Sequence, residues 1–195
     1  MLVTLAWATF ILWSFVFAWH TRYADSPVFA VKPQRRYWCA ATLCGIAGTM
    51  ILHWFIDPVL RPVAIEDYPT SPISLAAMTL FTLSFDQLFV CFAPFAFFMR
   101  LFRNRNVATG LTVLFGMFLL YIHARLWNAQ FSMPFVFELF AWRAASGFVA
   151  VYFFLRGGAM LTLWWAFLPQ LRHTSHTPLV PGDDVPKRVP VRDPY

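Results

Sequence analysis

Long blocks of apolar residues, each long enough to cross a lipid bilayer, constrain this chain more than any other feature of its sequence. The clearest block is Ile73–Met99, ISLAAMTLFTLSFDQLFVCFAPFAFFM. A helix needs about 20 mostly apolar residues to span the hydrocarbon core of a membrane. A soluble domain of 195 residues could not bury a composition that is 59% hydrophobic and only 12% charged. The sequence therefore predicts a polytopic membrane protein.

The apolar blocks predict an all-α transmembrane helix bundle with five full spans and a short sixth helix. Arg156-Gly157-Gly158 interrupts the last run and Pro169 ends it, which leaves only about 15 Å of helix for the sixth. We take residues 1–171 as a single transmembrane domain and residues 172–195 as a flexible, Pro-rich basic tail. The predicted spans are 2–19, 37–56, 73–99, 107–122, 134–155 and 159–171.

Basic residues are concentrated in alternate loops, and this predicts the orientation of the spans. Residues 20–36 carry four Lys and Arg against Asp25, and residues 100–105 carry three Arg. Because cytoplasmic loops are rich in Lys and Arg, both segments should be cytoplasmic and the N-terminus outside, in a bacterial cytoplasmic (inner) membrane. We then expect the basic residues behind the net charge of +6 to interact with anionic lipid rather than with nucleic acid. The basic tail favours the cytoplasm, whereas a complete sixth crossing places it outside, and the sequence leaves both open.

Asp86 lies near the middle of the third apolar block, where a carboxylate costs at least ~2.5–3.5 kcal/mol. Such a side chain faces other helices, finds a partner or stays protonated. Arg143, inside the fifth block, is the candidate partner for a structural ion pair that joins the third and fifth helices. This interpretation requires no catalysis, and removing one partner of a buried pair costs ~3–5 kcal/mol.

Three further ionisable residues, His53, His123 and Glu138, fall near the outer ends of their predicted helices. Two histidines and a carboxylate suit zinc. The alternative is that all three are wet, interfacial side chains, with Glu138 near a helix N-terminus, where negative charge is favoured. His53 or His123 could also ligate a pigment or haem, and Trp164 and Trp165 could line a groove for a lipid, quinone or pigment. Lipid is the ligand we expect first, with metal and pigment as alternatives.

The second half of the chain carries three motifs in a fixed order. FDQLFVCF contains Asp86, Gln87 and Cys91, and LLYIH contains Leu119 and His123. GFVAVYFFLRGGAMLTLWWAFL then leads to Phe167 and Leu171. In composition and in the spacing of these motifs, Ile73–Leu171 resembles the CPBP family, the CAAX-protease and bacteriocin-processing (Abi) membrane proteins. That family has a Glu-Glu-x-x-x-Arg helix, a helix ending in Phe-x-x-x-His, and a closing His-x-x-x-Asn or Asp.

The resemblance implies a related helical fold, and a site in which glutamates and histidines hold a metal or activate water for peptide-bond hydrolysis. Asp86 and Gln87 stand at the paired glutamates, and His123 stands at the first histidine. Cys91 replaces the arginine, Leu119 the phenylalanine, Phe167 the last histidine and Leu171 the Asn or Asp. Asp86 and His123 alone are too few for a catalytic zinc, which takes three protein ligands and a water.

These observations predict a non-catalytic integral membrane protein, an accessory or scaffold subunit of a larger membrane complex. Its expected partners are membrane lipids and other membrane subunits. One alternative is a variant intramembrane metalloprotease that uses Asp86 and His123, with Glu138 as a further ligand. The other is a subunit that binds a pigment, haem or quinone.

Overall fold

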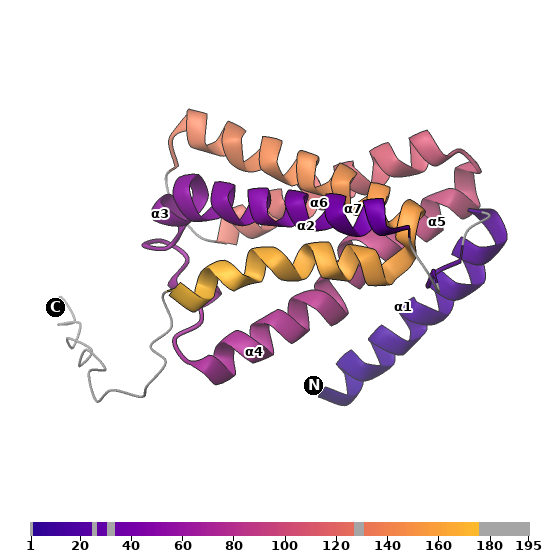
Figure 1. Ribbon diagram of the computed structural model, residues 1–195, viewed down its shortest axis with the longest axis horizontal. Helices are drawn as coiled ribbons and strands as arrows, with labels where there is room; N and C mark the ends of the chain where they lie inside the picture. Colours follow the sequence, from indigo (N-terminus) through magenta and orange to yellow (C-terminus); the bar gives the residue numbers. More distant parts are fainter. Residues whose placement is uncertain (1, 25–26, 31–33, 127–130, 176–195) are drawn as a thin grey trace, which may run out of the picture.

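Figure 1 shows the computed structural model of the protein, which describes residues 2–24, 27–30, 34–126 and 131–175. All the regular elements in these residues are helical, so the predicted all-α class is confirmed. The α-helices are α1 Leu2–Tyr23, α2 Arg35–Ile51, α3 Asp57–Leu60, α4 Pro72–Phe81, α5 Ala93–Phe102, α6 Arg105–Leu126 and α7 Met133–Phe167. The π-helical turns are η1 Leu52–Ile56, η3 Thr82–Asp86 and η4 Leu88–Phe92, and the 3-10 helices are η2 Ile65–Asp67 and η5 Leu168–Ser175.

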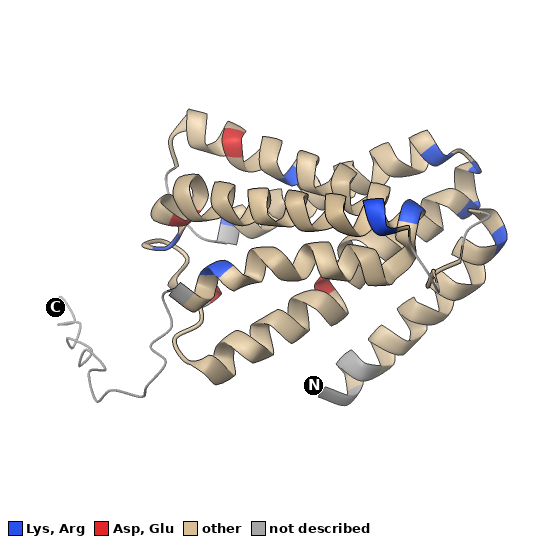
Figure 2. Cartoon of the chain, viewed as in Figure 1, with Lys and Arg blue, Asp and Glu red and all other residues tan. Residues whose placement is uncertain are grey.

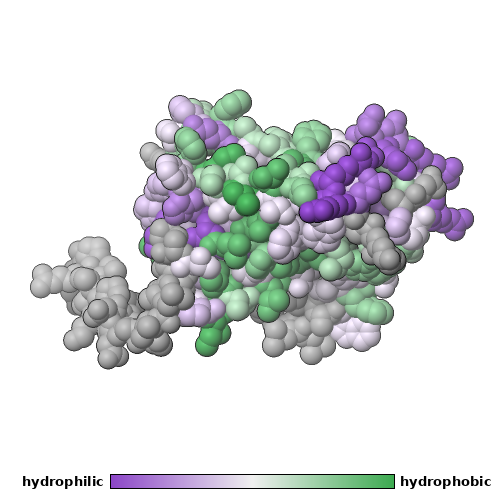
Figure 3. Space-filling view, in the orientation of Figure 1, coloured by the Kyte–Doolittle hydropathy of each residue, from purple (hydrophilic) through white to green (hydrophobic). Residues whose placement is uncertain are grey.

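Four helical segments among the described residues are long and apolar enough to cross a membrane. They are Arg35–Leu60, Pro72–Phe102, Arg105–Arg125 and Met133–Thr174. The last of these contains both of the final two predicted spans. The helix α1 is not one of the four. The prediction of five full spans and a short sixth helix therefore exceeds the number of segments found. Figure 3 shows hydrophilic residues at the two ends of the molecule and an apolar band between them, as a membrane protein requires.

The arginines of several loops meet at one end of the bundle, which we call the basic end (right-hand side of Figure 2). Arg105 donates a hydrogen bond to the carbonyl oxygen of Ala24 at 2.6 Å, which joins the start of α6 to the end of α1. The guanidinium of Arg156 lies 5.8 Å from the ring centroid of Tyr37, which joins α7 to the start of α2. The two segments predicted to share one side of the membrane therefore lie together.

The long helix α7 reverses direction at Gly158, whose φ of 69° and ψ of −168° are not helical. The reversal is anchored by the amide of Ala159, which donates to the carbonyl oxygen of Val28 at 2.7 Å. After the turn the chain runs back beside the first part of α7 (Figure 1), and the rings of Phe153 and Trp165 lie 6.3 Å apart. The break predicted at residues 156–158 is thus a sharp turn between two antiparallel arms.

The arm after Gly158 packs against α2, where small residues allow a close approach. A Cβ on Gly45 would lie 2.5 Å from Cδ1 of Leu168, and the Thr49 hydroxyl donates to the Leu168 carbonyl oxygen at 3.1 Å. The arm ends beside α3, where Arg172 contacts Asp57 at 3.0 Å, at the end of the bundle opposite the basic end. The start of the predicted tail therefore lies away from the arginine-rich loops, and residues 176–195 lie outside the described part of the chain.

The core is densest where α1, α5 and α7 meet around the ring of Phe154. That ring lies 4.6 Å from the ring of Phe92 and 6.0 Å from that of Phe95. The ring of His20 in α1 lies 4.3 Å from it, tilted by 34°, and has no exposed surface. Aromatic pairs at these separations add stability beyond the area that they bury. The core thus joins α1 firmly to the rest of the bundle.

We expect Gly158→Ala to destabilise the protein strongly. A Cβ there would lie 2.4 Å from the carbonyl oxygen of Val28, and a positive φ with an extended ψ costs about 1–3 kcal/mol for a residue with a side chain. The matched control is Gly110→Ala in α6, where a Cβ would meet nothing within 4 Å. Thermal unfolding in detergent should show a lower melting temperature for Gly158→Ala and an unchanged or higher one for Gly110→Ala. Equal melting temperatures would contradict the tight turn.

Candidate functional site

The helix that carries Asp86 departs from α-helical geometry around this residue. It contains two π-helical turns, η3 and η4, of which η3 ends at Asp86. Pro94 lies two residues beyond η4, and a proline removes a backbone donor and crowds the carbonyl group four residues earlier. The same arrangement occurs where η1 precedes Pro58. Because π turns inside helices are common at functional sites, this segment is a candidate site.

Asp86, His123 and Arg143 line one open groove of about 440 Å³, which we call the Asp86 groove. The three side chains come from η3, α6 and α7, respectively. Its remaining wall is apolar and consists of Phe89, Val90, Leu119, Leu120 and Ile122. The groove has the size of a small-molecule site, with few polar groups on apolar walls. Helix packing therefore brings together three of the polar residues that the sequence singled out.

Asp86 and Arg143 face the same groove but do not touch. The Nε of Arg143 donates instead to the carbonyl oxygen of Gly116 at 3.3 Å. Among the described residues, the carboxylate of Asp86 forms neither a hydrogen bond nor an ion pair within 4 Å. A direct Asp86–Arg143 ion pair therefore stays a prediction. The arrangement presents one carboxylate and one guanidinium side by side to whatever enters the groove.

His123 connects the rim of the groove to the loop between α3 and α4. Its Nε2 lies 3.4 Å from Oδ2 of Asp67, and both side chains are about half exposed. An exposed pair of this kind contributes at most about 1 kcal/mol to stability. The contact instead orients the imidazole, because it holds one ring nitrogen toward Asp67.

The other predicted site residues do not line the Asp86 groove. Glu138 is exposed on α7, and His53 lies in η1 of the second span. The described residues contain no cluster of three or more His, Cys, Asp or Glu side chains placed to hold a metal ion. Trp164 and Trp165 face different neighbours. The indole of Trp164 donates to Thr42 of α2 at 3.0 Å, whereas Trp165 is buried against Phe153.

A second polar cluster lies at the end of the bundle opposite the basic end. The Nε of Arg172 donates to both carboxylate oxygens of Asp57, at 3.3 and 3.0 Å, and the Tyr68 hydroxyl donates to Oδ1 at 2.8 Å. Burial, and then the hydrogen bond to the Asp57 carboxylate, raises the pKa of Tyr68 above its usual value. Since Asp57 is only 4% exposed, the cluster is a structural clasp rather than a binding site.

The sequence analysis missed this clasp because its two charges are 115 residues apart in the chain. Each charge directly follows an apolar block, Asp57 after the second and Arg172 after the last. That placement was the available signal, because opposite charges at neighbouring helix ends can pair.

No family model, no curated protein and no solved structure matches the chain. The groove must therefore be interpreted from its own chemistry.

A double-mutant cycle tests whether Asp86 and Arg143 interact across the groove. We expect Asp86→Asn and Arg143→Gln each to lower the melting temperature. The double variant should recover part of the loss, because opposite charges attract in a medium of low dielectric constant. The matched control is the cycle of Asp57→Asn with Arg172→Gln, whose partners touch at 3.0 Å. Additivity at Asp86–Arg143 together with coupling at Asp57–Arg172 would reject the pairing.

Proposed function

We propose that this chain is an integral membrane protein that works by binding, as a non-catalytic accessory subunit of a larger membrane complex. The observation that carries the proposal is the Asp86 groove, which presents a carboxylate and a guanidinium that are not paired with each other.

In this proposal the basic end faces the cytoplasm of a bacterial cell, in accordance with the distribution of Lys and Arg. The chain crosses the membrane with α1 and the four long apolar segments, and the arm after Gly158 crosses back as the short sixth helix. The N-terminus and the Asp57–Arg172 clasp then lie outside. The clasp supports the sixth crossing, because it fixes the end of the arm at the face opposite the arginine-rich loops.

Two opposite charges that line one open groove without touching favour a binding partner. A carboxylate at the centre of the hydrocarbon core costs at least ~2.5–3.5 kcal/mol unless a partner satisfies it. Asp86 is partly buried and reaches an open groove, where no described residue pairs with its carboxylate within 4 Å. A transmembrane helix of another subunit that carries one donor and one acceptor could satisfy both Asp86 and Arg143.

The proposal predicts that the protein, extracted in a mild detergent, has a native mass of fixed stoichiometry with at least one other membrane chain. Asp86→Asn and Arg143→Gln should each release that chain, because each removes one of the two charges that the partner helix contacts. The matched control is Glu138→Gln, an exposed acid outside the groove, which should retain the partner. A monomer or homodimer without a partner chain would overturn the proposal.

A second candidate function is hydrolysis by a variant intramembrane metalloprotease, as the resemblance to the CPBP family implies. It is favoured by one observation, the presence of Asp86 and His123 on the same groove. A metal there would take the carboxylate and the imidazole, with a further ligand from outside this pair, since catalytic zinc takes three protein ligands.

This candidate predicts a divalent metal in stoichiometric amount in the purified protein, with the metal lost in His123→Ala. Elemental analysis of both forms measures it. His53→Ala is the control, since His53 does not line the groove and its removal should leave the metal in place. A fully folded wild-type protein that binds no added zinc would reject the hydrolase.

A further inference from the structure

A second groove lies on the outside of the bundle, between α1 and α5. It has a volume of about 430 Å³, and all its lining side chains are apolar or aromatic. Leu12, Phe15 and Trp19 come from α1, and Ala93, Pro94 and Phe97 come from α5. We call it the Trp19 groove. It shares only Phe89 with the Asp86 groove, so the two are separate sites.

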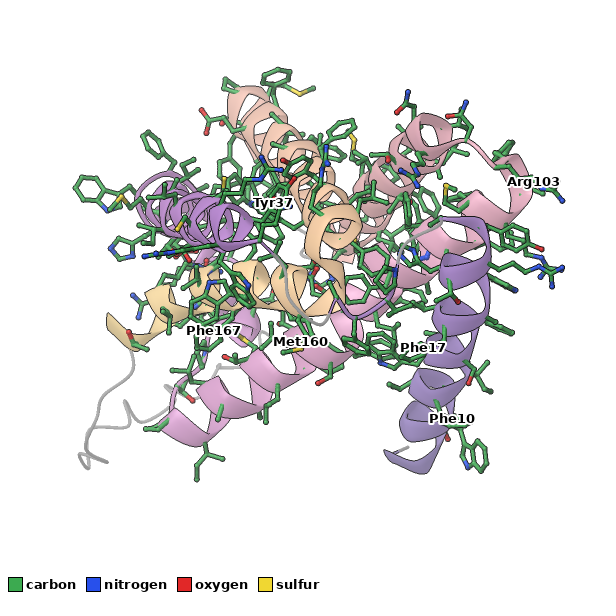
Figure 4. All side chains as sticks on the ribbon, turned by 45° about the vertical axis from the view of Figure 1, so that its right-hand side comes forward. Phe10, Phe17, Tyr37, Arg103, Met160 and Phe167 are labelled. Atoms are coloured by element: carbon green, nitrogen blue, oxygen red, sulfur yellow. The ribbon has the colours of Figure 1, made fainter. Side chains whose placement is uncertain are left out.

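The groove runs toward the basic end. From Leu12 to Trp19 it follows about 10 Å of α1, and α1 ends four residues later, at Tyr23. Figure 4 shows Arg103 at the same end of the molecule, whereas Phe17 lies further back along α1. The Trp19 groove thus leads along α1 toward a region of positive charge.

Three guanidinium groups lie on the aromatic rings at that end of the groove. Arg100 lies over Trp19, 4.7 Å from the ring centroid. Arg103 and Arg22 lie over Tyr23, at 5.9 and 5.8 Å. Trp19 is therefore both a wall of the groove and the platform for Arg100.

A guanidinium that lies on a ring is held in place by its face, while its N–H groups point outward in its own plane. All three arginines are exposed, and none forms an ion pair with a residue that the structure describes. Their donors are therefore available for a planar, bidentate contact with a phosphate group. Residues 20–36 and 100–105 together contain seven Lys and Arg and one acid, which favours an anion.

We propose that the Trp19 groove and the arginines at its end form a binding site for an anionic phospholipid. One acyl chain lies in the groove against Phe15, Trp19 and Phe97. The phosphate lies at Arg100 and Arg103, with Arg22 beside them. The arginines match the phosphate group of such a lipid, and the apolar Trp19 groove matches its acyl chain. This site is independent of the function proposed for the Asp86 groove.

The test uses the full chain in detergent, with phosphatidylglycerol and phosphatidylcholine as probes and native mass spectrometry as the readout. We expect phosphatidylglycerol to be retained and to raise the melting temperature, and phosphatidylcholine to do so much less. The double variant Arg100→Gln/Arg103→Gln should bind phosphatidylglycerol about tenfold more weakly, because it loses charge-assisted hydrogen bonds. Equal retention of the two lipids by the wild-type protein would overturn the proposal.

The matched control is Arg35→Gln/Arg36→Gln, which removes the same charge from the basic end but from α2. It should leave the retention of phosphatidylglycerol nearly unchanged. An equal loss in both double variants would mean diffuse attraction to the basic end and would reject a specific site. Inorganic phosphate is the second probe. If phosphate alone raised the melting temperature as much as the lipid does, the acyl chain would have no role in the groove and the proposal would fail.

Discussion

The reversal at Gly158 is the constraint on which the arrangement of the other helices depends. A residue with a side chain would meet the carbonyl oxygen of Val28 at 2.4 Å, so the segment after α1 can approach the turn only at a glycine. The hydrogen bond from Ala159 to Val28 then ties the start of the last arm to this segment. From there the arm packs on α2 at Gly45 and ends at Asp57. The backbone conformation of Gly158 thus positions the last arm, which runs from the basic end to the opposite end of the bundle.

The kinked third segment adds a second constraint. An uninterrupted α-helix has about 3.6 residues per turn. The position of a residue along such a helix therefore fixes the direction of its side chain. The two π turns change that direction, and Pro94 accounts for the second of them. As a result Asp86 faces α6 and α7 across a groove, while Leu88 and Phe92 are fully buried in the core. The fold has a tightly packed core and an open polar groove on the same helix.

The two ends of the molecule use their charges differently. At one end Asp57, Tyr68 and Arg172 satisfy one another in a buried cluster that holds the last arm in place. At the basic end Arg22, Arg100 and Arg103 lie on aromatic rings and are exposed. Removing one partner of a buried ion pair destabilises a fold, whereas an exposed guanidinium on a ring is available to bind a ligand. The asymmetry follows from the placement of the charges: Asp57, at the start of α3, is buried against Arg172, whereas the arginine-rich loops leave theirs exposed.

The sequence by itself determined the helical class, the apolar segments from residue 37 onward and the break at residues 156–158, because hydrophobic length and glycine are local properties. Tertiary structure alone decided which side chains meet. Arg143, predicted to pair with Asp86, donates to the Gly116 carbonyl oxygen, and Arg172 pairs with Asp57 across most of the chain. These contacts depend on the rotation of each helix about its axis and on the position of its end. The Gly158 turn and the π turns set both, and hydrophobic patterns do not encode them.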